Sequence, residues 1–239
     1  MSTALVLSAG GLFGAYQAGV WSELERCLKP DLVVGASIGA LNGWMIAGGA
    51  SARQLIEAWL EPPDAALRRL NRDIVERHAR RVFTAWEPRI PFGLVTTEFP
   101  SMRQRLFRTP GLTWRHLAGS SAIPLIFRHQ RIDGGLHADG GLLTPLPLWA
   151  ALEMGARRIV AVNVLKYRPL YIRAIAAAAC RYARFSPEQP PGIEVIEIAP
   201  SERIGTLRQS IEWSRDRIER WIAVGRRDAL GVLPSIAAR

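Results

Sequence analysis

The sequence predicts an α/β fold with three layers, α/β/α, in which helices cover both faces of a mainly parallel central sheet. Continuous apolar runs, such as residues 3–7 and 158–164, alternate with helix-like segments, and strands buried on both faces of a parallel sheet have this apolar pattern. Glycine-rich turns also join strand-like runs to helix-like runs at residues 9–14 and 35–39. A chain of 239 residues can form one sizeable core. We therefore expect a single domain over residues 1–239.

The first half of the chain supplies two strand–turn–helix units. A strand is expected over residues 3–7, and the helix after it, residues 15–28, ends at Lys29-Pro30 because proline cannot continue a helix. A second strand, residues 31–34, leads through a glycine-rich turn into a helix. The helices expected from here to the middle of the chain cover residues 40–47, 54–60 and 65–81, the last with Asp64 as its N-cap.

The second half contains a hairpin and returns to alternating strands and helices. Residues 125–130 and 136–138 predict two strands that turn at Asp133-Gly134-Gly135. The other elements expected are strands over residues 92–99, 158–164 and 194–198 and helices over residues 113–121, 147–155 and 207–227. The charge-free stretch over residues 32–50 is long enough to suggest a membrane span. We interpret it as a buried strand, turn and helix, because it contains several glycines and polar residues.

The turn Gly35-Ala36-Ser37-Ile38-Gly39 has the G-x-S-x-G form of a nucleophile elbow between a strand and a helix. Such a turn holds its serine in a strained backbone conformation, and the flanking glycines avoid collisions with the neighbouring strand and helix. The hydroxyl of Ser37 would then project near the positive end of the helix that follows. Taken alone, the motif also fits a glycine-rich turn with an ordinary serine.

The earlier turn, residues 9–14, can direct backbone N–H groups toward an anion. A nucleotide phosphate site is disfavoured, because neither G-x-G-x-x-G nor the P-loop pattern is present. The other interpretation is an oxyanion hole, in which fixed N–H donors stabilise the negative charge that develops during acyl transfer. Gly10 and Gly11 are the candidate donors.

A serine nucleophile needs a base, and the chain offers histidines or a carboxylate. No histidine lies in the last hundred residues, where an α/β-hydrolase would normally place it. The four histidines, interpreted as surface or interface residues with the last two kept as minor candidates, are His78, His116, His129 and His137.

Asp139, in Asp139-Gly140-Gly141, is the carboxylate candidate. The glycines leave the carboxylate uncrowded, and partial desolvation would raise its proton affinity enough for a Ser–Asp dyad. The alternative is that Asp139 only forms a turn, which is the interpretation that fits Asp133 in the earlier Asp-Gly-Gly sequence.

Several motifs together, in this order, resemble the patatin-like phospholipase family. They are Ser8–Tyr16, Gly35–Asn42, Ser120–Pro124, Asp139–Gly141 and the terminal helix from Ile218 to Trp221. The resemblance implies a three-layer α/β/α fold and a Ser37–Asp139 dyad that hydrolyses acyl esters of lipids, with Gly10 and Gly11 in the oxyanion loop. It implies no metal or other cofactor. It favours Asp139 over Asp133, because a proline-bearing segment follows Asp139.

The chain departs from the family pattern in four places. Ala9 replaces a third glycine, Phe13 replaces an arginine or lysine, Thr144 replaces an asparagine, and residues 92–120 form a short segment. Losing the cation at Phe13 removes a positive charge near the anion site and favours a neutral ester over a charged phospholipid. Two alternatives remain open: an acyltransferase that uses the same serine, and a non-catalytic lipid-binding protein with this fold.

The net charge of +10 comes almost entirely from arginine, with lysine only at Lys29 and Lys166. This arginine bias is also compatible with genomic base composition, but a basic surface favours contact with anionic bilayers. The arginine-bearing apolar segment over residues 170–185 fits a helix at a lipid interface, or equally an ordinary packed helix with a basic edge. No nucleic-acid-binding signature is present, so we expect no nucleic acid partner.

The location expected from the sequence is cytoplasmic, with peripheral and transient contact to an anionic membrane. The N-terminus lacks the basic region of a signal peptide. Cys27 and Cys180 are far apart in the sequence and have no metal-binding spacing, so we expect free thiols in a reducing compartment.

Overall fold

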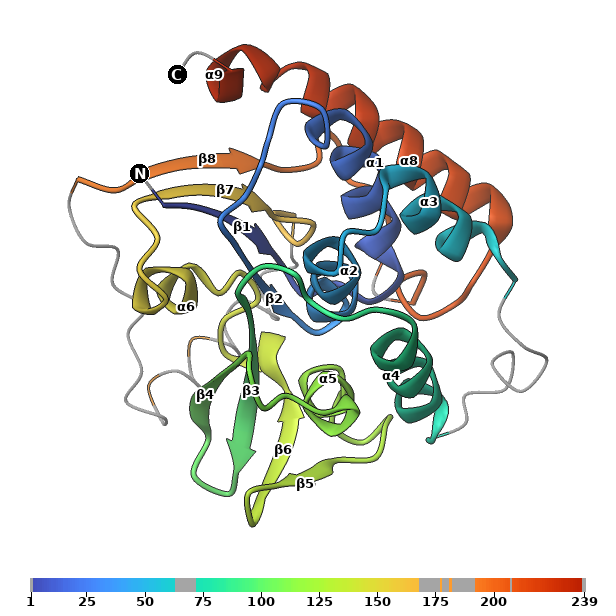
Figure 1. Ribbon diagram of the computed structural model, residues 1–239. Coiled ribbons are helices and arrows are strands. Elements are labelled where there is room, and N and C mark those ends of the chain that lie inside the picture. Colours follow the sequence, from blue (N-terminus) through green and yellow to red (C-terminus); the bar gives the residue numbers. More distant parts are fainter. Residues whose placement is uncertain are drawn as a thin grey trace.

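A computed structural model describes residues 2–62, 72–167, 177, 181, 192–206 and 208–237. An eight-stranded sheet runs through the centre (Figure 1), in the order β5-β6-β3-β2-β1-β7-β8, and β4 pairs with β3 beside this path. The strands are β1 (Thr3–Leu7), β2 (Leu32–Ala36), β3 (Phe92–Phe99), β4 (Arg103–Arg108), β5 (Gln130–Ile132), β6 (Gly135–Asp139), β7 (Arg158–Val162) and β8 (Glu194–Ile198).

Helices connect most of these strands. They are α1 (Gly14–Leu24), α2 (Ile38–Ala47), α3 (Ala52–Leu60), α4 (Ile74–Ala85), α5 (Trp114–Ser120), α6 (Leu148–Glu153), α8 (Arg215–Leu230) and α9 (Leu233–Ala237). Two short 3₁₀ turns, η1 (Gly11–Phe13) and η2 (Gly140–Leu142), follow β1 and β6.

The five strands β3, β2, β1, β7 and β8 pair with one another in parallel, and β4, β6 and β5 are added in antiparallel pairs. This arrangement confirms the predicted mixed fold with a mainly parallel sheet. Because neighbouring parallel strands end at the same edge, the turns that follow β1 and β2 lie together at their carboxyl ends.

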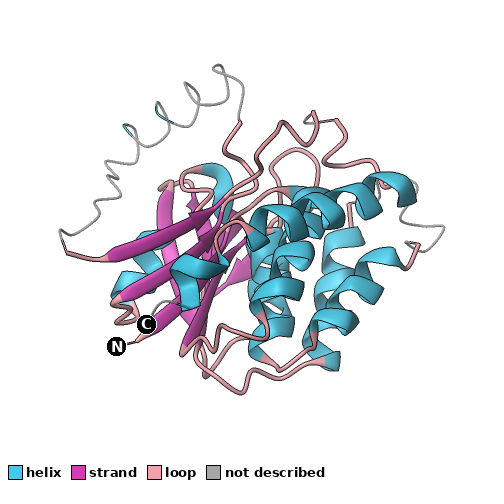
Figure 2. Cartoon of the chain, turned by 90° about the horizontal axis from the view of Figure 1, so that it is seen from above, coloured by secondary structure: helices cyan, strands magenta, loops and turns pink. Residues whose placement is uncertain are grey.

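Alternate side chains of the central strands enter two separate apolar clusters, one on each face of the sheet. On one face Leu5 and Leu7 pack with the larger group of helices, which Figure 2 shows gathered on one side of the sheet. On the other face Ala4 and Val6 belong to a smaller cluster that includes Ala150 of α6. Helices therefore cover both faces, as the apolar strands predicted.

The structure corrects three of the sequence predictions. Residues 125–129 are not part of a strand, since the hairpin consists only of β5 and β6. Strand β4 was not predicted at all, because its sequence, RQRLFR, is half arginine and contains only two apolar residues. The last long helix, α8, begins at Arg215 rather than at residue 207.

Other predictions concern residues outside the described part of the chain. They include the Asp64 N-cap, the start of the predicted helix over residues 65–81, Cys180, and nearly all of the segment over residues 170–185. Cys27 is an exposed free thiol. The stretch over residues 32–50 forms β2, the turn at Ser37 and α2. Within the described ranges, no helix has the length and apolar character that crossing a membrane requires.

Candidate active site

Ser37 occupies a sharp turn between the end of β2 and the start of α2. Its φ of 54° and ψ of −125° lie in a region that L-residues rarely adopt. A Cβ atom on Gly35 would collide with the carbonyl oxygen of Gly39, and one on Gly39 would collide with the carbonyl oxygen of Leu7. The spacing of the two glycines around Ser37 is therefore a steric requirement of this turn.

The sheet order brings Asp139 to this turn from 102 residues away along the chain. Asp139 ends β6, which pairs with β3, and β3 lies next to β2. The Ser37 Oγ–H donates a hydrogen bond of 2.5 Å to Asp139 Oδ2. Both residues are buried, with exposed fractions of 4% for Ser37 and 5% for Asp139. The structure thus brings Ser37 and Asp139, the candidate nucleophile and base of the sequence analysis, into direct contact.

Hydrogen bonds fix the Asp139 carboxylate and the backbone around it. Oδ1 accepts the N–H of Gly141 at 2.7 Å, which leaves Oδ2 directed at Ser37. The backbone N–H of Asp139 donates to the carbonyl of Ala122 at 3.0 Å, and its carbonyl accepts the Thr97 hydroxyl at 2.9 Å. The carboxylate is therefore held in one orientation before any substrate binds.

Burial raises the pKa of Asp139 from 3.8 to about 6. The hydrogen bonds from Ser37 and Gly141 act in the opposite direction, because they stabilise the ionised form, but burial has the larger effect. A carboxylate with this proton affinity is ionised at neutral pH and can still accept a proton from a hydroxyl as that hydroxyl attacks.

Ser120, at the end of α5, holds the backbone of the turn at Ser37. Its fully buried hydroxyl accepts the N–H of Ser37 at 3.0 Å and donates to the carbonyl of Val95 in β3 at 2.7 Å. The N–H of Ser37 is thus already engaged. Donors to a substrate oxygen must come from other backbone groups. Ser120 lies in a motif that resembles the family, but the sequence alone indicates no role for it. Its hydrogen-bond partners, Ser37 and Val95, lie 83 and 25 residues away along the chain.

The loop with Gly10 and Gly11 adjoins both sides of the serine–aspartate pair. A Cβ atom on Gly39 would approach the carbonyl of Ser8, and one on Gly141 would collide with Ala9. Backbone hydrogen bonds at each end fix the loop, from Ala9 to Pro145 and from Leu12 to Ser210, both 2.8 Å. The N–H groups of Gly10 and Gly11 have no hydrogen-bond partner within the described residues.

A buried polar network connects this loop to the helix behind Ser37. Gln17 in α1 donates to the carbonyl of Ser8 at 2.7 Å and accepts from the Asn42 side chain of α2 at 2.9 Å. Asn42 in turn accepts from the indole of Trp59 at 3.1 Å. Because these groups satisfy one another in the core, they fix the distance between the glycine loop and the turn at Ser37.

Phe13, where the family pattern has a cation, packs into the core. Its ring contacts Trp221 of α8 edge-to-face at a centroid distance of 5.0 Å, and only 4% of its surface is exposed. The side chain therefore contributes to packing between the glycine loop and α8.

None of the histidines hydrogen bonds to Ser37 in the described structure. His116 interacts with Thr113 at the start of α5, and His137 contacts the hydroxyl of Thr96. His129 stacks on Phe99. Asp133 lies exposed in the turn between β5 and β6. Asp139 is therefore the base candidate that the geometry favours.

Comparison with known proteins gives relatives along most of the chain. A family model described as patatin-like phospholipase matches residues 5–89 and 62–152. Lysophospholipase NTE1 of Mycosarcoma maydis is 31% identical over 182 residues, covering 69% of this chain and 10% of that protein. Patatin-like phospholipase domain-containing protein 7 of Rattus norvegicus is 28% identical over 187 residues, covering 67% of this chain and 13% of that protein. The chain thus spans only a small part of the length of these relatives.

Two solved structures have a similar fold. VipD from Legionella pneumophila superposes with a TM-score of 0.58 at 12% identity, covering 98% of this chain and 67% of that one. The type III effector protein ExoU superposes with a TM-score of 0.52 at 13% identity, covering 100% of this chain and 53% of that one. At this level of identity the similarity concerns the fold alone.

Proposed function

Because the chain belongs to the patatin-like phospholipase family, we propose that it is a serine acyl hydrolase that cleaves carboxylic ester bonds of lipids through a Ser37–Asp139 dyad. The observation that carries the proposal is the 2.5 Å hydrogen bond from the Ser37 hydroxyl to the buried Asp139 carboxylate. The substrate class is phospholipid, lysophospholipid or neutral acyl ester. The name of one relative, Lysophospholipase NTE1, supports this class.

In the first half of the reaction, Asp139 accepts the Ser37 proton as Oγ attacks the acyl carbon. The carbonyl oxygen becomes an oxyanion, which the N–H groups of Gly10 and Gly11 stabilise, each donor by about 3 kcal/mol in the transition state. The tetrahedral intermediate then collapses, the bond between the acyl carbon and the alcohol oxygen breaks, and Asp139 returns the proton to the leaving alcohol. Ser37 remains as an acyl ester.

In the second half, water takes the place of the alcohol. Asp139 accepts a proton from water as the water oxygen attacks the acyl-Ser37 carbon. The second tetrahedral intermediate releases the fatty acid, and Ser37 Oγ recovers the proton from Asp139. The same carboxylate is base and acid in turn, which its pKa of about 6 permits near neutral pH.

We propose that neutral esters are preferred over substrates with a charge close to the scissile bond. Phe13 supports this preference, because the glycine loop carries a buried aromatic ring at the position where the family pattern places a cation. The Gly10 and Gly11 donors can still stabilise an oxyanion, since hydrogen bonding to a developing charge does not need a formal cation.

The proposal is tested with a fluorophosphonate probe and an ester panel. We expect the probe to label the wild type and a Ser101→Ala variant, whose hydroxyl is exposed after β3, and to leave Ser37→Ala unlabelled. Turnover of neutral esters, lysophospholipids and diacyl phospholipids should disappear in Ser37→Ala. Labelling of Ser37→Ala equal to that of the wild type would refute Ser37 as the nucleophile, whereas no labelling of any of the three proteins would favour a non-catalytic lipid-binding role. Acyl transfer to an added alcohol in place of hydrolysis would identify an acyltransferase instead.

We further propose that residues 1–239 form one domain and that the protein acts in the cytoplasm, at the periphery of a membrane. The continuous sheet from β5 to β8 supports the single domain. The exposed free thiol of Cys27 supports a reducing compartment. Expression as a fluorescent fusion and fractionation at low and high salt would test the location.

A further inference from the structure

Leu125 combines two unfavourable features at one position on the surface. Its side chain is 94% exposed, more than the other exposed large apolar residues, Tyr167 at 49% and Leu230 at 54%. Its φ is +68°, a conformation that costs a leucine free energy and a glycine almost none. Since no described part of the fold buries this side chain, a role for it must involve something outside the folded chain.

The surroundings of Leu125 extend the apolar surface. The turn over residues 123–127 reads Ile-Pro-Leu-Ile-Phe, and none of its five side chains is fully buried. The turn also begins beside the active site, because the carbonyl of Ala122 accepts the N–H of Asp139. An object that docks on this turn would therefore lie close to the serine–aspartate pair.

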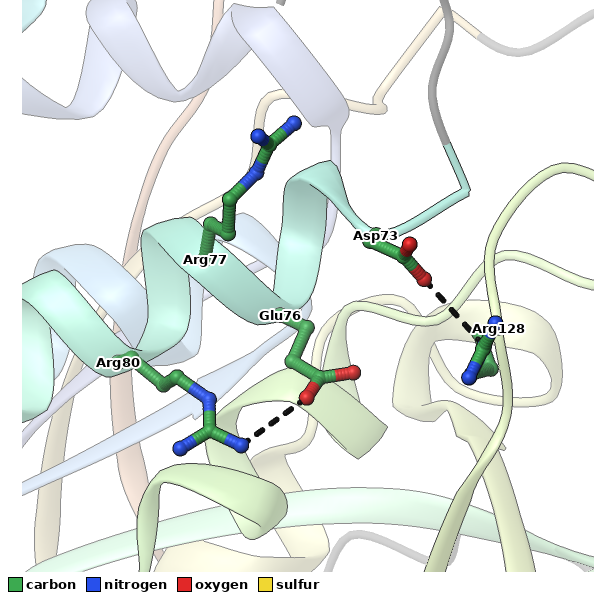
Figure 3. A pocket seen from close by; sticks show the side chains of 5 residues that line it. All are labelled: Asp73, Glu76, Arg77, Arg80 and Arg128. Carbon is green, nitrogen blue, oxygen red and sulfur yellow. Dashed lines mark hydrogen bonds and ion pairs between the residues drawn. The ribbon is translucent and has the colours of Figure 1, made fainter.

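Arginines flank the apolar turn on the side of α4. Arg128, with a side chain 66% exposed, follows the turn, and its N–H donates to the carbonyl of the exposed Arg72 at 3.3 Å. A shallow cavity of about 340 Å³ lies here (Figure 3). Its lining residues are Asp73, Glu76, Arg77, Arg80 and Arg128.

The charges of this region are only partly neutralised. Arg128 faces Asp73 at 3.3 Å, and Arg80 pairs with Glu76 at 3.1 Å. Figure 3 shows Arg77 directed away from these two pairs, and Arg77 pairs with no described residue. With Arg72, four arginines thus stand against two carboxylates, so the surface beside the apolar turn is basic.

We propose that the turn over residues 123–127 docks on an anionic phospholipid bilayer, with Leu125 inserted among the lipids and the arginines at positions 72, 77 and 128 against headgroup phosphates. The proposal rests on the proposed function insofar as the substrate is a lipid. Apolar side chains at an interface and basic residues near anionic lipids each strengthen bilayer binding. Docking of this turn would bring the active site to the surface from which the acyl chain is drawn.

A bilayer fits this surface better than a second protein does. Stable protein interfaces bury about 800 Å² on each partner with close shape complementarity. A turn of five residues with one fully protruding leucine provides neither. A bilayer needs no complementary shape, because lipids rearrange around an inserted side chain.

The test measures partition onto vesicles of phosphatidylcholine with and without phosphatidylglycerol, in a Ser37→Ala background that prevents hydrolysis. We expect Leu125→Ala to lower the partition coefficient on anionic vesicles about tenfold, as the loss of a mostly buried leucine side chain predicts. The matched variant Leu230→Ala, which also removes an exposed leucine, should bind like the parent. Raising the salt should weaken binding to the anionic vesicles only.

Two further measurements separate the explanations. Leu125→Gly removes the side chain and the backbone strain, so its melting temperature should equal or exceed that of the parent while its vesicle binding falls. Equal vesicle binding by the Leu125 and Leu230 variants would contradict the proposed docking surface. Equal binding of the parent to vesicles with and without phosphatidylglycerol would contradict it as well. A change of oligomeric state in Leu125→Ala without a change in partition would identify a second copy of the chain as the occupant, which also overturns it. Because vesicle binding is measured without turnover, its result does not depend on whether Ser37 hydrolyses lipids.

Discussion

The tripeptide Asp-Gly-Gly occurs twice within nine residues, and its two copies have opposite environments. Asp133 lies exposed in the turn between β5 and β6, with a φ of +48°. Asp139 lies at the other end of β6, buried and hydrogen bonded to Ser37. Strand β6 begins with the last residue of the first copy and ends with the first residue of the second, and it runs beside β3 toward the turn after β2. The position in the sheet, rather than the local sequence, therefore decides which of the two carboxylates contacts Ser37.

The glycines after the two aspartates are needed for different reasons. Gly134 has a φ of +81° and open space where a Cβ atom would be, so it serves the backbone conformation of the turn. A Cβ atom on Gly140 would collide with the carbonyl of Val95 in β3. The first glycine of the second copy is thus packed tightly against the strand next to Ser37, whereas the first glycine of the first copy faces open space.

The largest difference between the copies should appear in turnover. Asp139→Asn removes the base next to Ser37, so we expect kcat for ester hydrolysis to fall about 10³-fold, within the range for a lost general base. Asp133→Asn should keep most of the activity, because asparagine also tolerates a positive φ in a turn. Steady-state kinetics on one soluble ester measures both. An equal loss in the two variants would show that the hairpin as a whole, rather than Asp139, supports the reaction.

The second prediction concerns folding stability. Gly140→Ala should destabilise the fold by about 3 kcal/mol, since a methyl group must displace the backbone of β3. Gly134→Ala should cost about 1 kcal/mol, because only the positive φ is penalised. Urea denaturation of the two variants measures the difference. Similar urea midpoints for the two variants would mean that β3 shifts readily to accommodate the methyl group. This outcome would contradict a rigid support for Asp139.

Two neighbouring serines provide a smaller contrast of the same kind. The Ser120 hydroxyl bridges Ser37 and Val95, whereas the buried hydroxyl of Ser121 has no hydrogen-bond partner among the described residues. Ser120→Ala should lower kcat about 30-fold with little change in KM, because the backbone of Ser37 loses its support while the substrate site remains. Ser121→Ala should be close to wild type in both constants.

A pH profile distinguishes positioning by Ser120 from a general loss of structure. The hydrogen bond from Ser37 lowers the pKa of Asp139, so a poorly held Ser37 in Ser120→Ala should shift the acidic limb of kcat/KM to higher pH. Ser120→Cys, which keeps a weak donor and acceptor, should recover part of the rate. If Ser120→Ala and Ser121→Ala lose the same activity with unchanged pH limbs, Ser120 has no positioning role.

The sequence predicted the parts of the molecule that local pattern determines. The apolar strand at residues 3–7 and the sharp strand-to-helix turn at Ser37 depend on neighbouring residues, and both are present. The predicted strand is absent over residues 125–129, and Leu125 there adopts a positive φ, which an apolar pattern does not reveal. The bridge made by Ser120 could not be foreseen either, since its partners come from β3 and from the end of β2.

The smallest expected effect is that of pH. Lowering the pH should reduce the activity and increase the stabilising contribution of Asp139. With the pKa of Asp139 raised to about 6, kcat/KM of the wild type should be about tenfold lower at pH 5 than on its plateau, because the protonated carboxyl cannot accept the Ser37 proton. A raised pKa also means that folding favours the protonated form. The stabilising contribution of Asp139 is complete below pH 3.8 and is lost as the pH rises through 6.

Asp139→Asn removes this titration and should therefore gain stability relative to the wild type between pH 4 and pH 7. The upper bound of the gain is about 3 kcal/mol, from the difference between pKa values of 3.8 and about 6. Thermal melts of both proteins across this range measure it, and Asp133→Asn provides the matched control. A constant difference in melting temperature at all pH values would contradict the raised pKa. A gain confined to Asp139→Asn would show that the fold gives up stability to keep a buried, ionised carboxylate beside Ser37.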